Sequence, residues 1–232
     1  MITTKNEFIV LGSSSGFPQA DRATAGYVLK AGESLSLIDC GGGVTSSFLK
    51  RGLDPLAVKR ILVSHSHPDH CCELPLFIQL IYLSGREEPL DLYLPSEFVE
   101  PFRAYMNATY LIAEKLPFEV RFVGYEDDFS FEDDISVKAV ANNHLKGYAD
   151  LIEKLNLPNE MQCYSLRIEV GDQTIFYSAD IGTFDDIKNH LDGHSLVVLE
   201  STHVDLDQFF EFAQEISVGR YLISHLGSAD EI

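Results

Sequence analysis

The sequence predicts a single-domain α/β protein in which short buried strands alternate with helical stretches. Apolar runs of about four to six residues, rich in Val, Ile and Leu and ended by polar or glycine turns, are typical of buried strands. Other apolar residues, such as Leu74, Phe77, Ile78 and Ile81, recur at helical spacing. His, Asp and Glu residues recur where the strands end. Since no repeat or linker composition interrupts the chain, residues 1–232 are expected to form one domain.

Composition narrows the functions that the chain can have. Its 232 residues can bury a sizeable core, and its net charge is −19 with only 17 Lys and Arg. A surface this acidic repels phosphate backbones and anionic membranes, so we expect a small-molecule substrate rather than nucleic acid or a membrane. The sequence is compatible with a homo-oligomer.

The cysteines and the N-terminal segment predict a cytoplasmic protein. Cys40, Cys71, Cys72 and Cys163 show no C-x-x-C spacing, which favours reduced thiols. The first ten residues lack the pattern of a signal peptide, and no apolar run is long enough to span a membrane.

The first third of the chain contains three predicted strands and one helix. Residues 8–11 form a strand that runs into the Gly/Ser turn 12–18, which either binds an anion through backbone N–H groups or is a plain turn. Residues 27–30 and 36–39 are the next strands, and 44–51 are a helix. Asp39 comes before three glycines, so it either orients a metal-bound imidazole or acts as a cap or turn residue.

The most informative stretch is residues 61–70, ILVSHSHPDH. An apolar strand over 61–63 is followed by four ligand-type side chains, with Pro68 preventing an early helix start. His65 and His67 lie two residues apart, so in an extended segment they can bind one ion together. Asp69 and His70 suit a second, adjacent ion. Imidazole and carboxylate are ligands that zinc, iron and manganese share.

The middle of the chain supplies one further candidate ligand. Residues 71–84 are predicted to be a helix with Cys71 and Cys72 as packing residues at its start, followed by a strand at 90–94 and a helical segment to about 116. Strands at 118–123 and 135–140 flank an acidic loop, and the second leads to His144. The helical stretch within 146–160 is either a lid over a site or a surface helix packed on the core.

The last third repeats the pattern of a strand followed by a ligand-type residue. Strands at 163–170 and 175–178 lead to Asp180, whose two oxygens can bridge two cations. A helix over 184–191 is followed by a strand at 197–199 that ends in Glu200 and, three residues later, His203. A helix at 206–216 and a strand at 221–224 lead to His225, while His190 and His194 are expected on the surface.

The order H-x-H-x-D-H, a lone His, a lone Asp and a last His resembles the metallo-β-lactamase superfamily over nearly the whole chain. The resemblance implies a four-layer αββα sandwich with two mixed sheets and two divalent metal ions, zinc or alternatively manganese or iron. It implies that His65, His67 and His144 hold the first ion, that Asp69, His70 and His225 hold the second, and that Asp180 bridges them.

Within the superfamily, the opening LGSSSGFPQADRATAGYVL and the LIDCGGG turn resemble the ribonuclease Z and small phosphodiesterase branch. The chain departs from ribonuclease Z in lacking a long Gly/Pro-rich arm and a later His-rich motif, and in its charge. We therefore expect a binuclear metal-dependent hydrolase of small phosphodiesters. Hydrolysis of a carboxylic ester, lactone or thioester, RNA processing, and a non-catalytic metal-binding module are the alternatives.

The resemblance also predicts how the residues divide the reaction. The implied nucleophile is a hydroxide, formed from a water whose pKa two bound cations would lower, and Asp69 can hold it in line. Glu200 and His203 are either a proton-donating pair for the leaving group or an ordinary cap and turn pair. For an ester substrate, Tyr148 or Tyr164 can stabilise the oxyanion. Of the basic residues, Arg22, Arg86, Lys146 and Lys154 fall near the predicted site loops.

Overall fold

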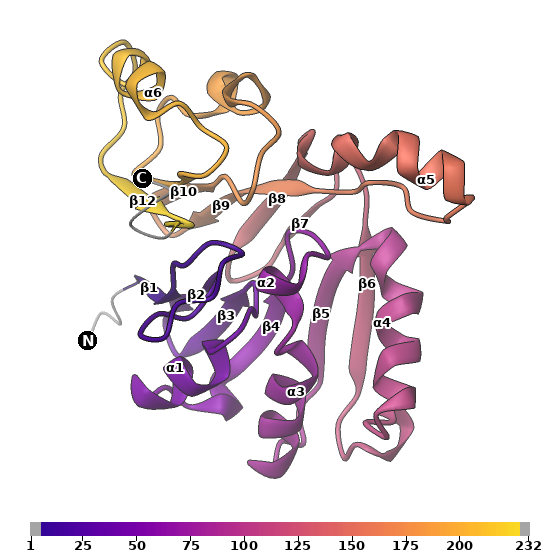
Figure 1. Ribbon diagram of the computed structural model, residues 1–232. Coiled ribbons are helices and arrows are strands. Elements are labelled where there is room, and N and C mark those ends of the chain that lie inside the picture. The colour runs from indigo at the N-terminus through magenta and orange to yellow at the C-terminus, as the bar shows by residue number, and fades with distance from the viewer. Residues whose placement is uncertain (1–5, 228–232) are drawn as a thin grey trace, which may run out of the picture. The chain divides into compact units, whose positions relative to one another are not determined.

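The computed structural model describes residues 6–227 and divides the chain into two compact units, with the division between Tyr125 and Glu126 (Figure 1). Each unit is described by itself below. The single domain that the sequence predicts over residues 1–232 remains a prediction.

Over residues 6–125, the first unit contains one six-stranded sheet and four α-helices. Its strands are β1 (Glu7–Gly12), β2 (Gly26–Ala31), β3 (Ser34–Ile38), β4 (Val58–Leu62), β5 (Leu90–Pro95) and β6 (Val120–Tyr125). Its helices are α1 (Val44–Lys50), α2 (Pro68–Cys71), α3 (Leu74–Leu83) and α4 (Ser96–Ala108), with short 3-10 helices at Pro55–Ala57 and Ala113–Lys115.

The order of this sheet is β1-β2-β3-β4-β5-β6. The pairs β1–β2 and β2–β3 are antiparallel, whereas β3–β4, β4–β5 and β5–β6 are parallel. Ile38 pairs with Leu62, the last residues of β3 and β4. Because parallel neighbours end at the same edge of a sheet, the segments after β3 and β4 start side by side.

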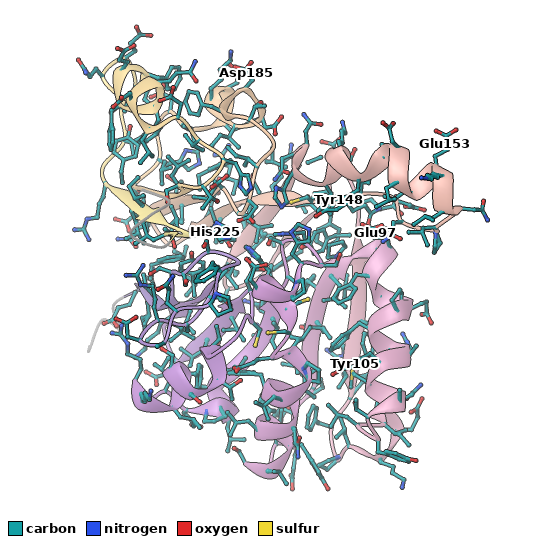
Figure 2. The ribbon with its side chains drawn as sticks, viewed as in Figure 1. Glu97, Tyr105, Tyr148, Glu153, Asp185 and His225 are labelled. Atoms are coloured by element: carbon teal, nitrogen blue, oxygen red, sulfur yellow. The ribbon has the colours of Figure 1, made fainter. Side chains whose placement is uncertain are left out.

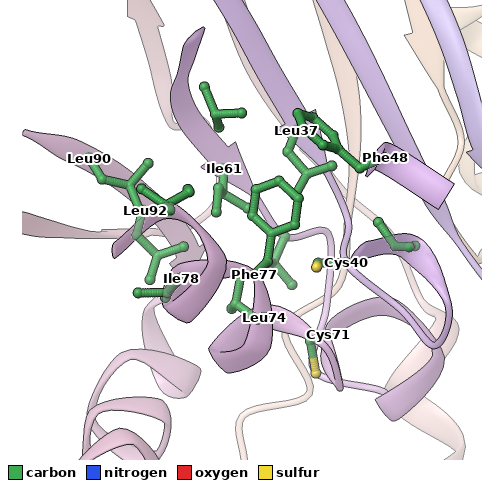
Figure 3. Close-up of a cluster of buried hydrophobic side chains, with 14 of the residues drawn as sticks. Leu37, Cys40, Phe48, Ile61, Cys71, Leu74, Phe77, Ile78, Leu90 and Leu92 are labelled. Atoms are coloured by element: carbon green, nitrogen blue, oxygen red, sulfur yellow. The ribbon is translucent and has the colours of Figure 1, made fainter. Parts of the chain in front are cut away.

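The core of the first unit packs α1 and α3 against this sheet (Figure 3). Phe48 of α1 and Phe77 of α3 meet edge to face with ring centroids 5.0 Å apart, and both are fully buried. Leu37 and Ile61 of the sheet belong to the same cluster. This packing fixes the positions at which the loops after β3 and β4 begin.

The second unit contains another six-stranded sheet, with fewer helices. Its strands are β7 (Ser130–Glu132), β8 (Ser136–Ala141), β9 (Tyr164–Val170), β10 (Gln173–Tyr177), β11 (Leu196–Glu200) and β12 (Tyr221–Ser224). Its α-helices are α5 (Ala149–Leu155) and α6 (Leu206–Phe212), and 3-10 helices lie at His144–Tyr148, Phe184–Asp186 and Lys188–His190.

The order of the second sheet is β12-β11-β10-β9-β8-β7. The pairs β10–β11 and β11–β12 are parallel and the rest are antiparallel. Two antiparallel steps separate β8 from β10, so β8 runs in the same direction as β10, β11 and β12. These four strands therefore end at one edge of the sheet. Both sheets are mixed, as predicted.

Several predicted elements are shorter or divided in the structure. The helix expected over 71–84 is two helices, α2 and α3, and Pro68 opens α2 rather than delaying a helix. The helix expected over 184–191 is two 3-10 turns, and β7 was not predicted. His194 is buried, not on the surface, and its Nδ1 lies 3.1 Å from the carbonyl oxygen of Leu191.

Over residues 6–227, no helix has both the length and the apolar character needed to cross a membrane.

Candidate metal-binding site

The first group of predicted ligands follows β4. This strand is buried, and His65 and His67 come three and five residues after its end, with His67 in extended backbone. Their rings meet with centroids 4.8 Å apart, and each offers a ring nitrogen within 4.8 Å of the other's. The two imidazoles are therefore close enough to bind one ion together, and that they do so remains a prediction.

Asp69 and His70 lie on α2, a single helical turn that opens with Pro68. Proline suits this first position because its missing N–H has no helical partner there. Nε2 of His70 lies 3.5 Å from Oδ2 of Asp69. The same turn brings His70 to His65, with ring centroids 4.2 Å apart, so all four predicted ligands of the first unit form one cluster.

Asp39 orients this cluster from the end of β3. Its Oδ1 accepts from the Ser64 backbone N–H at 2.7 Å, and its Oδ2 accepts from the Ser64 hydroxyl at 2.9 Å. Oδ2 also lies 2.8 Å from Nδ1 of His70. With Nδ1–H donating to the carboxylate, the lone pair of His70 is on Nε2, which is the arrangement a metal ligand needs.

The alternative interpretation of Asp39 as a helix cap is wrong. The first N–H groups of α1 are capped instead by Glu73, which lies 30 residues beyond Gly43: Oε1 accepts from Gly43 at 2.7 Å and Oε2 from Thr45 at 2.8 Å. Asp39 is also fully buried and has a left-handed backbone, with φ of 56°. Such strain in a non-glycine residue is tolerated where its side chain is held by several partners.

The thiols near this cluster are free, and their contacts are those of packing residues. The Cys71 thiol donates to the backbone oxygens of Ser66, at 3.4 Å, and His67, at 3.2 Å. Burial, followed by the nearby Asp39 charge, raises the pKa of Cys71 to about 12. Burial likewise raises the pKa of Cys40 well above its usual value. Cys71 is a packing residue as predicted, whereas Cys72 is exposed.

The second group of predicted ligands lies in the second unit, where four strands end at one edge. Asp180 follows β10, and His144 follows β8. His225, labelled in Figure 2, directly follows β12. Oδ2 of Asp180 lies 3.6 Å from Nε2 of His144 and 3.3 Å from Nε2 of His225. One carboxylate oxygen thus faces both imidazoles, and Asp180 is itself buried.

Two residues that sequence reasoning missed contact these histidines, one at a ring nitrogen and one at the backbone. The Thr202 hydroxyl lies 2.8 Å from Nδ1 of His225, and the backbone N–H of His144 donates to Oδ1 of Asn142 at 3.0 Å. A hydroxyl or an amide has no characteristic spacing to a histidine in the sequence. Ser64, beside Asp39, was missed for the same reason.

Glu200 and His203 are also together in the second unit. Nδ1 of His203 lies 3.0 Å from Oε1 of Glu200, and Oε2 of Glu200 accepts from the backbone N–H groups of Thr202 and His203. Glu200 is buried at the end of β11, whereas the side chain of His203 is 39% exposed. The His203 ring lies 4.9 Å from that of His144. A buried carboxyl group bound to Nδ1 and a partly exposed ring can together move a proton at Nε2 of His203.

The two tyrosines considered as oxyanion donors differ in exposure. Tyr164 is buried in β9, and Tyr148 is 48% exposed at the end of a 3-10 helix. Of the basic residues near the predicted loops, Arg86 donates to the backbone oxygens of Leu56 and Pro89.

The donor set fits divalent metal ions. Two ligands bound at about 2.0–2.1 Å to one tetrahedral ion lie about 3.3–3.4 Å from each other. The spacings of 3.5, 3.6 and 3.3 Å at His70–Asp69, His144–Asp180 and His225–Asp180 are close to that value. They are longer than the 2.7–2.9 Å or so of a charge-assisted hydrogen bond. The structure groups the ligands within each unit, and the joint set of seven remains a prediction.

Comparison with known proteins identifies relatives of this architecture. The family model described as "Beta-lactamase superfamily domain" matches residues 36–226. A ribonuclease Z of Methanothermobacter thermautotrophicus is 36% identical over 104 residues, which are 45% of this chain and 34% of the relative. The chain spans about a third to a half of the length of the curated relatives that it matches, which are also ribonucleases Z.

Solved structures resemble the chain over almost its whole length. The metallo-beta-lactamase fold protein YhfI from Bacillus subtilis has a TM-score of 0.76 at 22% identity, over 97% of this chain and 88% of that one. A diphosphatase from the PhnP family has a TM-score of 0.66 at 17% identity, over 96% and 87%. These likenesses confirm the predicted fold class.

Proposed function

The chain belongs to the beta-lactamase superfamily, and on this premise we propose that it is a metal-dependent hydrolase of small phosphodiesters. The proposal combines the two ligand groups into one site: His65, His67 and His144 for one ion, Asp69, His70 and His225 for a second, and Asp180 for both. The observation that carries it is the position of Asp180, whose Oδ2 faces the Nε2 atoms of two histidines at ligand-sharing distances.

The ions would supply positive charge and a water of lowered pKa when bound. The chain's own residues do the rest. Asp39 holds the lone pair of His70 on Nε2, and Thr202 fixes the ring of His225. Glu200 anchors Nδ1 of His203, which leaves the partly exposed ring positioned to give a proton to the leaving oxygen through Nε2.

A phosphodiester is favoured over an ester or lactone by the residues at hand. An oxyanion that forms from a carbonyl needs a positioned donor, and the candidate Tyr164 is buried within a strand while Tyr148 is on an exposed turn. A phosphodiester carries its own negative charge, which two cations and a protonated His203 can neutralise without such a donor.

Ribonuclease Z-like RNA processing is the second candidate, because the curated relatives carry that name. Those relatives are two to three times as long as the matched segment. The net charge of −19 weighs against a large polyanion, since each phosphate contact on nucleic acid needs a nearby cation.

Metal analysis and a substrate screen test the proposal. The purified chain is expected to contain two divalent ions, and Asp180→Ala is expected to lose at least one ion and nearly all turnover. Asp172→Asn, on an exposed turn of the second unit, is the control and should keep both. Bis-p-nitrophenyl phosphate should be hydrolysed, and lactones and thioesters should not. A lactone or thioester turned over while the diester is inert would overturn the choice of substrate.

A further inference from the structure

The first unit contains a cavity of about 730 Å³ between α1 and the loop of residues 12–24. Its volume is in the range of about 300–1,000 Å³ typical of small-ligand sites. Asp69 and Gly16 both line it, and a Cβ atom on Gly16 would be 3.5 Å from Oδ2 of Asp69. The cavity therefore opens onto a residue that we have proposed as a metal ligand.

From Asp69 the cavity follows one face of α1. Gly43, Ser46, Ser47 and Lys50 line it at helical spacing, and Arg51, the next residue along the chain, lines it as well. The rise of an α-helix places residues 43 and 50 about 10 Å apart. A molecule bound here with its reacting group at Asp69 would present its other end to Lys50 and Arg51.

The balance of charged side chains that line this cavity is opposite in sign to the net charge of the whole chain. Arg22, Lys50 and Arg51 line the cavity, against Asp21 and Asp69. The whole chain has 36 acidic residues and 17 Lys and Arg, so three cations on one cavity are a local excess. Arg51 also donates to the backbone oxygen of Val10 at 3.1 Å. Within residues 6–227, neither Arg22 nor Lys50 is found in an ion pair.

A further polar group on the same wall needs a partner. Nε2 of Gln19 is buried and, over the described part of the chain, makes no hydrogen bond. A buried donor without an acceptor costs free energy until an acceptor arrives. The hydroxyls of Ser14 and Ser15, by contrast, bind the backbone of their own turn, at the carbonyl of Phe17 and its N–H. The charged donors that line the cavity are thus Arg22, Lys50 and Arg51.

We propose that this cavity binds the part of the substrate beyond the scissile phosphodiester, and that this part ends in a second phosphate held by Arg22 and Lys50. The proposal rests on the function proposed above and names its substrate class: a compact phosphodiester with a terminal phosphomonoester, of about the size of one nucleotide. Charge-assisted hydrogen bonds from guanidinium and ammonium groups suit a phosphate best.

A matched pair of chromogenic substrates tests this specificity. The p-nitrophenyl ester of thymidine 5′-phosphate is compared with the same ester carrying a 3′-phosphate, and bis-p-nitrophenyl phosphate serves as a substrate with no second anion. We expect the 3′-phosphate to lower KM about tenfold or more, which is the effect of one good charge-assisted contact. In the Arg22→Gln/Lys50→Gln variant the difference should fall below about twofold, with bis-p-nitrophenyl phosphate turnover unchanged.

Lys115→Gln is the control for net charge, because Lys115 is an exposed cation of the same unit that does not line the cavity. Three results would overturn the inference. The control could lose the preference for the 3′-phosphorylated ester, the double variant could keep it, or the native chain could have equal KM values for the two esters. A preference that grows with every added nucleotide would do the same and point to nucleic acid. If the double variant does not fold, Lys50→Gln alone, at an exposed position, carries the test.

Calorimetry separates this inference from the proposed function. Thymidine 3′,5′-bisphosphate should bind the metal-loaded native chain at least tenfold more tightly than thymidine 5′-phosphate, by the same contact, and the double variant should lose the difference. If the bisphosphate binds more tightly but no diester is hydrolysed, the proposed function is wrong and the assignment of the cavity is supported. If diesters are hydrolysed without this difference in binding, the assignment of the cavity is wrong and the proposed function is supported.

Discussion

Three residues next to the candidate ligands, or among them, have a left-handed backbone. Asp39, Ala179 and His225 have φ values of 56°, 50° and 53°. Each comes just after a strand, at the edge where its sheet presents polar groups. This conformation costs about 1–3 kcal/mol in residues other than glycine. Neighbouring contacts offset that cost, such as the three hydrogen bonds to Asp39, so the strain is accepted in exchange for the direction of a side chain.

At Asp39, replacement of one oxygen by an NH2 group tests this orienting role. Because the Ser64 N–H requires an acceptor at Oδ1, Asp39→Asn would place its amide NH2 at the position of Oδ2, facing Nδ1 of His70. Nδ1 would then accept, the proton would move to Nε2, and that nitrogen could no longer bind a metal. Asparagine tolerates the left-handed backbone, so the fold should survive.

We expect Asp39→Asn to weaken metal affinity about 10–100-fold, as measured by competition with a chromogenic chelator. Asp54→Asn is the matched control, because Asp54 caps only the 3-10 helix at Pro55–Ala57. Equal affinities for Asp39→Asn and the native chain would show that Asp39 has no orienting role.

Among the elements, the loop after β3 and the turn α2 are joined by close backbone contact. The Cys40 N–H donates to the carbonyl of His70 at 2.7 Å, and the Thr24 hydroxyl donates to that of Asp69 at 2.8 Å. Gly41 lies against the same carbonyl, and a Cβ atom there would overlap the Asp69 oxygen and the Thr24 hydroxyl. Glycine is required at this position by close approach rather than by its φ angle.

Gly41→Ala should therefore push α2 away from the loop. We expect a loss of about 1–3 kcal/mol in the free energy of unfolding, the usual cost of overpacking, together with weaker metal binding. Chemical denaturation and chelator competition measure the two effects. Gly147→Ala is the control, because no atom lies within 4 Å of a Cβ atom at that position. A stable Gly41→Ala variant with full metal affinity would contradict this account.

The sequence predicted most elements where one physical signal dominated. The apolar run at 221–224 is β12 as expected, and β4 and α1 differ from the prediction by a few residues. The break between α2 and α3 has a sequence signal that the prediction overlooked, because Pro75 lies in the first turn of α3 and favours a helix start there. β7 lies within a run of acidic residues, and only its pairing with β8 makes it a strand.

At the scale of the whole molecule, the site too has residues that the sequence predicted and residues that it did not. His65, His67, Asp69 and His70 were predictable because they adjoin one another in the sequence, whereas Ser64 and Thr202 act through hydroxyls that occur everywhere. Arg22 and Lys50 lie 28 residues apart, and only the fold of α1 beside the loop puts them on one cavity. Contacts between distant residues of ordinary type have no sequence signature.

The prediction of a single domain can be tested by calorimetry. If the proposed ligands from both units share the same ions, metal stabilises the units together. The metal-loaded chain should unfold in one transition with equal calorimetric and van't Hoff enthalpies, and chelation should lower its Tm. Two transitions, of which only one shifts with metal, would show that the units are separate domains and that one of them binds metal alone.

The choice between small diester and RNA depends on the charge of the whole molecule. An excess of nineteen negative charges raises the free energy of bringing a polyanion near, whereas a diester of nucleotide size needs only the ions and the cations of one cavity. We therefore expect that bulk tRNA at low salt changes the turnover of bis-p-nitrophenyl phosphate by less than about twofold, since affinity from phosphate contacts requires several cations along a strand.

Turnover is measured at several salt concentrations, with thymidine 3′,5′-bisphosphate as the positive control for inhibition. Strong inhibition by tRNA that weakens steeply as salt rises, with a slope of about 0.9 per phosphate contact, would mean that the acidic and basic residues are segregated on the surface. The ribonuclease Z-like function would then replace the one proposed above.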